Sequence, residues 1–176
     1  MAVSQVYTLG LSKIEIGDIA EGGGMGTTLE QLGYTLQDSC SMTQEDPQTT
    51  EFLAEEVDDP VISIDRGGKT TFNFSIMNPD LTVLQKLLGG EVTGTGEAAV
   101  WNAPNTMPVI EKSVKITPKQ GLVFSIPRMK LVAKINGQFS RSNVFVIEVV
   151  GTVLVPTDGT TAKMSAKKLE NPAPEV

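Results

Sequence analysis

Residues 65–90 read DRGGKTTFNFSIMNPDLTVLQKLLGG, and within this stretch the spacing of apolar residues changes from that of a strand to that of a helix. Phe72, Phe74 and Ile76 alternate with polar residues. A period of two predicts a strand with one buried and one polar face. A single helix inside a chain otherwise rich in strand patterns indicates a mostly β or α+β protein.

The helix is predicted over about residues 79–88, where leucines recur at helical spacing. Asn78 is the expected N-cap and Pro79 the expected first residue, because a side-chain acceptor and a proline both suit unpaired helical N–H groups. Lys86 in the last turn suits the negative end of the helix dipole. Gly89 and Gly90 predict the end of the helix, since glycine readily adopts the left-handed conformation found there.

The rest of the chain predicts short strands, and we expect a β-sandwich or barrel-like fold with one flanking helix. Apolar and polar residues alternate, or apolar residues cluster, within residues 5–19, 34–43, 61–64, 69–76, 110–116, 122–126, 129–135 and 144–155. We expect the 61–64 and 69–76 strands to form a hairpin through Arg66, Gly67 and Gly68. We expect residues 144–155 to be the longest strand and to be buried on both faces.

The segment 44–59 is acidic and polar, and it lies between two prolines, so we predict a partly extended loop with a mobile portion. The length of the chain predicts one domain, residues 1–156, followed by a polar, mobile tail, residues 157–176.

The composition removes most classes of enzyme. The chain has no histidine, which excludes histidine-based acid–base catalysis, histidine-activated nucleophiles and imidazole metal ligands. Cys40 is the only cysteine, so neither an internal disulfide nor a cysteine-based zinc site can form. The glycine run at residues 22–26 lacks the lysine of a phosphate-binding loop. We therefore expect no catalytic residue, no cofactor, no metal and no small-molecule substrate. We also expect synthesis in the cytoplasm without a membrane span, since no apolar segment is long enough.

The charges are distributed unevenly along the chain. Residues 1–65 contain thirteen Asp or Glu and one Lys, a balance of −12, whereas residues 66–176 have a balance of +5. Such halves can pair within one copy or between the front of one copy and the back of the next, and a contact of the second kind builds rings or filaments. A solvated acidic loop is the other interpretation.

In the order of its features, the chain resembles the major tail tube proteins of long-tailed bacteriophages. Five stretches carry the resemblance and together reach about residue 155: IEIGDIAEGG; LGYTLQDSCSMTQED with the acidic TTEFLAEEVDDP; VISIDRGGKTTFNFSIMNPDLTVLQKLLGG; VIEKSVKITPK with PRMKLVAKING; and FVIEVVGTVLV. This family is related to the tube proteins of contractile injection and type VI secretion systems.

The resemblance implies a structural virion subunit, located in the tail, that forms hexameric rings. The rings stack into a tube that contacts other tail proteins, and DNA passes through its lumen without specific binding. We expect acidic and basic side chains to make the contacts between copies, namely Glu51, Glu55, Glu56, Asp58 and Asp59 against Lys112, Lys115, Lys130 and Lys134.

Two alternatives remain. The chain could be another β-rich structural or binding module, such as a tail terminator, a baseplate component or a carbohydrate-binding adhesion module, although its aromatic content is low. It could also be a glycoside-cleaving enzyme that uses two of Glu51, Glu55 and Glu56 as acid and base. The enzyme would need both carboxyls on rigid elements across a cleft.

Overall fold

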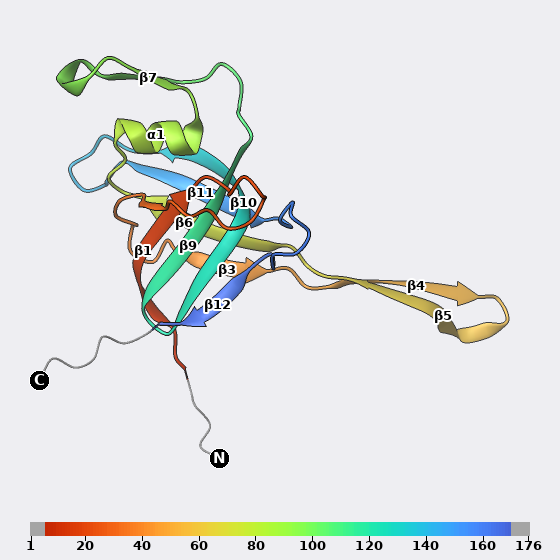
Figure 1. Cartoon of the computed structure of the whole chain (residues 1–176). Helices are drawn as coiled ribbons and strands as arrows, with labels where there is room; N and C mark the ends of the chain where they lie inside the picture. The colour runs from red at the N-terminus through yellow and green to blue at the C-terminus, as the bar shows by residue number, and fades with distance from the viewer. Residues whose placement is uncertain (1–5, 170–176) are drawn as a thin grey trace, which may run out of the picture.

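The computed structural model describes residues 6–169 and shows a mostly β chain with one α-helix (Figure 1). The strands are β1 (Leu9–Gly17), β2 (Glu30–Gln31), β3 (Ser41–Gln44), β4 (Gln48–Ala54), β5 (Val57–Arg66), β6 (Thr70–Ile76), β7 (Glu91–Thr93), β8 (Val100–Asn102), β9 (Ile110–Gln120), β10 (Leu122–Asn136), β11 (Val146–Val153) and β12 (Ser165–Lys168). The helix α1 spans Leu81–Leu88, and a short 3₁₀ turn spans Gly96–Ala98. The expected mostly β fold with one helix is confirmed.

One antiparallel sheet forms the body of the protein. Its strand order is β2-β1-β9-β10-β11-β6-β3, and β12 pairs with the first half of β10 beside β11. The strand order ends at β2 on one side and at β3 on the other. The segment that follows β2 links the two sides at one end, since Leu32 N donates to the Ile14 carbonyl of β1 at 3.2 Å and Leu36 N donates to the Ser75 carbonyl of β6 at 2.8 Å. Within residues 6–169 the sheet stays open at its other end, beside β3. The small β7–β8 pair lies beyond α1, and Trp101 in β8 donates its indole N–H to the Gly89 carbonyl at 2.9 Å.

The hydrophobic core of the described residues combines side chains from β1, β9, β10, β11, β6 and α1. In β6 every second residue is buried, as its alternation predicts, and Phe74 stands opposite Val149 of β11. Gly151 stands opposite Phe72, and a Cβ there would lie 2.2 Å from the Met129 sulfur. The glycine therefore leaves room for Met129, which is fully buried.

The helix begins two residues later than predicted. Asp80 is the N-cap, and its Oδ1 accepts a hydrogen bond from Val83 N at 2.7 Å. Asn78 is not the cap because its own Oδ1 accepts from Tyr34 N at 2.6 Å. The end of the helix agrees with the sequence, since Gly89 caps it with a φ of 77°.

Two predictions about strand lengths were wrong. The predicted 122–126 and 129–135 strands are one strand, β10, which continues through an irregularity in its pairing with β9. It is longer than β11, which spans only Val146–Val153 and is not buried on both faces, since Val150 is 43% exposed. Val149 is buried and its neighbour Val150, which faces the opposite side of the sheet, is exposed, so apolar residues on both faces did not signal burial there.

The predicted hairpin between residues 61–64 and 69–76 was also wrong. β5 pairs with β4, and β6 pairs with β3 and β11. The acidic segment predicted to be a loop is therefore mostly strand, and its reversal occurs at Glu55 and Glu56. Gly67 and Gly68 connect β5 to β6, and the chain keeps its direction from one strand to the next. These glycines therefore do not form the turn of a hairpin.

The segment 157–176, predicted as a mobile tail, contains β12, which pairs with β10. Leu169 N continues this contact by donating to the Gly121 carbonyl at 2.8 Å. The rest of the predicted tail, residues 170–176, lies outside the described residues.

Candidate functional site: a projecting arm and an open groove

Strands β4 and β5 form a two-stranded arm that projects away from the body (Figure 1). Each strand of the arm pairs with the other and belongs to no larger sheet. A two-stranded hairpin without a further layer is at best marginally stable in water. The arm, defined here as residues 48–66, is thus an element whose side chains lack a packing partner within the described chain.

One face of the arm carries an apolar stripe. Phe52 stands opposite Ile62, and Thr50 stands opposite Ile64 on the same face. Phe52, Ile62 and Ile64 are 53%, 53% and 48% exposed, so each side chain contacts its cross-strand neighbour and leaves about half of its surface in water. An exposed apolar stripe on a projecting element marks an interaction surface. The other face carries Glu51 opposite Ser63, together with the exposed side chains of Leu53 and Val61.

The five carboxylates singled out in the sequence, Glu51, Glu55, Glu56, Asp58 and Asp59, all lie on the arm. With Asp65 and Arg66 they give the arm a charge of −5. Among the ion pairs found in residues 6–169, none involves an arm residue. The arm is therefore both apolar and strongly acidic, and no ion pair with another described residue neutralises its charge.

The four predicted basic partners lie on β9 and β10 of the body, and the structure does not bring them to the arm of the same chain. Lys112 pairs with Asp18, and Lys134 pairs with Glu148 at 2.7 Å. Lys115 stands opposite Glu15 in the β1–β9 ladder, and Lys130 stands opposite Thr152 of β11. Two of the four lysines thus already have an acidic partner within the chain.

These ion pairs lower the pKa values of the acids that form them. The hydrogen bond and charge of Lys112 lower the pKa of Asp18, and hydrogen bonds from Lys134 and Asn136 lower the pKa of Glu148. On the opposite side of β10, Glu111 receives two hydrogen bonds from Arg128, at 2.8 and 3.1 Å, and this raises the pKa of Arg128. The body therefore neutralises much of its own charge, in contrast to the arm.

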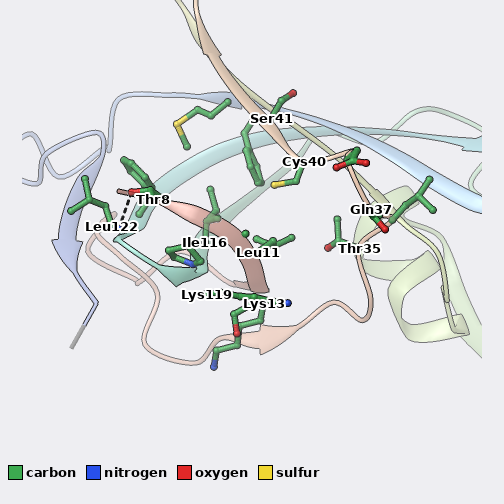
Figure 2. Close-up of a pocket in the computed structure, with 18 of the residues that line it drawn as sticks. Thr8, Leu11, Lys13, Thr35, Gln37, Cys40, Ser41, Ile116, Lys119 and Leu122 are labelled. Atoms are coloured by element: carbon green, nitrogen blue, oxygen red, sulfur yellow. Dashed lines mark hydrogen bonds between the residues drawn. The ribbon is translucent and has the colours of Figure 1, made fainter. Parts of the chain in front are cut away.

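Sequence reasoning missed a groove of about 1060 Å³ at the open end of the sheet. Its floor consists of apolar side chains from β1, β6, β9 and β10, and its walls come from residues 8–13 on one side and residues 33–44 on the other. Figure 2 shows Leu11 and Ile116 between Cys40 and Lys119, and a hydrogen bond from Leu122 N to Thr8 Oγ1 at one end. Burial raises the pKa of the Cys40 thiol. No local motif could have revealed this groove, because it forms only when the fold brings residues 8–13 close to residues 33–44.

The arm begins beside the groove. Gln44 and Thr70, which line the groove, form the last pair of the β3–β6 ladder before the arm. The connection is tight, since Glu45 N donates to the Lys69 carbonyl at 2.9 Å and a Cβ on Gly68 would lie 1.7 Å from the Glu45 carbonyl oxygen. The base of the arm is thus fixed by backbone contacts.

Neither models of known protein families nor the curated proteins match this chain. Its function is therefore inferred from its own geometry and from the order of its sequence features. The helices within residues 6–169 are all too short or too polar to cross a membrane.

Proposed function

We propose that this chain is a structural virion protein, a major tail tube subunit that assembles into stacked rings. The observation that carries the proposal is the arm, an extended acidic hairpin with an apolar stripe and no packing partner among residues 6–169 of its own chain. Such an element gains packing in an assembly and has none in a monomer. The order of features shared with tail tube proteins supports the same function.

The open sheet supports assembly through a second route. Its terminal strands β2 and β3 have a hydrogen-bonded neighbour on one side only. Unpaired edges are prone to association, and joining the sheets of neighbouring copies satisfies them. We propose that the rings are hexameric, as in the family, and that their tube contacts other tail proteins.

DNA would pass through the lumen of this tube without specific binding. The chain has a net charge of −7. Specific and non-specific DNA-binding proteins attract phosphates with basic surfaces, whereas an acidic protein repels them. A conduit needs that repulsion, because adhesion to its wall would slow the ejection of DNA.

The first test is assembly of the purified full chain, observed by negative-stain electron microscopy and light scattering. We expect rings with a central hole or stacked tubes. A matched variant replaces residues 48–66 with a short Gly-Ser turn, which is feasible because Gln44 and Thr70 already stand opposite each other. We expect this variant to keep a cooperative thermal unfolding transition, since the arm lies outside the core, and to lose stacking. If the full chain stays monomeric even at high concentration and in the presence of tail tips, the proposed function is wrong.

Charge reversal tests which basic surface meets the arm of a neighbour. Lys115 and Lys130 are the better targets of the four predicted lysines, because Lys112 and Lys134 pair with acids of the body. If these two lysines contact the arm, Lys115→Glu with Lys130→Glu weakens assembly. Unchanged assembly in this double variant would remove them as partners.

The groove favours a second candidate function, a β-rich structural or binding module such as a tail terminator, a baseplate component or an adhesion module. It is large enough for an extended peptide or a short glycan, and its lining combines apolar and polar side chains. A stable monomer that binds such a ligand, with protection of groove residues in hydrogen exchange, would favour this function over the tube.

A further inference from the structure

The groove lies between two strand edges that lack a neighbour. β3 pairs with β6 on one side and is the last strand of the sheet. β1 pairs with β9 along its length, but β2 pairs only with its residues Glu15 and Ile16. The outer edge of residues 9–12 is therefore open, and these residues form one wall of the groove. An extended segment placed here could pair with either edge, which is how many proteins bind strands.

The chemistry of the groove matches that of the arm. Partly buried apolar side chains, Leu11, Met42 and Phe124, lie at the open end of the core and line the groove. Among the charged residues of the lining, Lys13 already pairs with Glu15 at 3.0 Å, which leaves Lys119 as the basic residue that can meet a carboxylate of the arm, against one acid, Asp38. An apolar floor beside Lys119 suits an apolar stripe flanked by carboxylates.

An arm cannot reach the groove of its own chain without breaking its base. It leaves the body directly beside the groove, and the Glu45–Lys69 hydrogen bond and the close contact at Gly68 hold the two connecting segments together. Folding back would require both segments to reverse over residues 45–47 and 67–69. An arm that occupies the groove therefore comes from another copy.

On the basis of the proposed function, we propose that the groove between β1 and β3 receives the arm of a second copy, with the apolar stripe facing the floor. Each copy then has one donor arm and one acceptor groove. Such a contact is heterologous, so it repeats from copy to copy and forms closed rings or an open stack.

Cysteine cross-linking tests this contact because Cys40, the only cysteine of the chain, lines the groove. In the variant Thr50→Cys the new thiol lies on the arm face that carries Phe52 and Ile62, and the stripe itself is unchanged. The full chain is oxidised with copper phenanthroline at mildly alkaline pH, since the raised pKa of Cys40 slows thiolate formation. We expect a ladder of disulfide-linked oligomers on a non-reducing gel.

Two controls make the ladder specific. Adding Cys40→Ser to Thr50→Cys should abolish it. Ser63→Cys places the thiol on the opposite face of the arm, so it should yield at least tenfold less cross-linked product at equal oxidation time. Equal ladders from both faces would overturn the proposed orientation and contradict docking in the groove.

Microscopy of the same samples separates this inference from the proposed function. Tubes without a Thr50→Cys ladder would overturn docking in the groove and leave the tube function standing. A ladder without rings or tubes would support the docking and contradict the tube function. The absence of both, with a native circular dichroism spectrum, would refute both.

Discussion

The apolar stripe of the arm provides the sharpest test of how copies associate. We consider a variant with Phe52→Ser, Ile62→Thr and Ile64→Thr, which keeps residues that suit a strand. Each of the three side chains is about half exposed, so assembly can bury roughly half of each. Full burial of such a side chain contributes about 1.5–3 kcal/mol, so three half-burials contribute roughly 2.3–4.5 kcal/mol per contact. At about 1.4 kcal/mol per tenfold, the variant should associate roughly 40- to 1,600-fold more weakly.

Sedimentation velocity over a concentration series measures this change directly. The melting temperature of the dissociated protein should stay nearly constant, because the arm contributes nothing to the core. The control variant changes Leu53 and Val61, which alternate with the stripe along β4 and β5, to threonine. The reasoning fails if the stripe variant assembles at the same concentration as the wild type, or if the control weakens assembly equally.

The body of the protein allows further predictions. Phe74→Ala should lower the free energy of unfolding by about 3–5 kcal/mol in denaturant titrations, because Phe74 is 1% exposed and packs on Phe72 at 5.2 Å between ring centroids. Asp80→Ala should cost about 1 kcal/mol in the same assay, since it removes the cap of α1. Lys112→Met should raise the pKa of Asp18 in an NMR titration. Because the pKa of Asp18 is lowered in the folded protein, the ion pair stabilises the fold at pH values above the pKa of an unfolded Asp. This stabilisation is lost as the pH falls through the pKa of Asp18 in the folded protein.

The sequence predicts the body well because its signals are local. The alternation in β6 and the start and stop signals of α1 depend on neighbours along the chain, and both elements form with errors of about two residues at the helix start. The expected strands in residues 5–19 and 110–135 also form, as β1, β9 and β10. The spacing of apolar residues is enough to predict a strand or helix where one face of that element is buried.

The arm was not predicted because its turn carries no hairpin signal, although its two strands are neighbours in the sequence. Its reversal at Glu55 and Glu56 contains no glycine or asparagine, and its acidic residues are typical of loops. Its apolar residues alternate as in a buried strand, so they suggested pairing with β6. The sequence singled out the five carboxylates as candidate contact residues, but it did not predict that they lie together on one hairpin.

The arm is also continuous with the body, since its strands run into β3 and β6 through short connections. β6 lies inside the sheet between β3 and β11, and it is paired with β11 over six residues. Hydrogen bonds in an antiparallel ladder are perpendicular to the strands. A pull on the arm along its axis therefore loads all of these bonds at once in shear, and they do not open one after another. Mechanical force applied at the arm thus reaches the part of the body that is built to resist it.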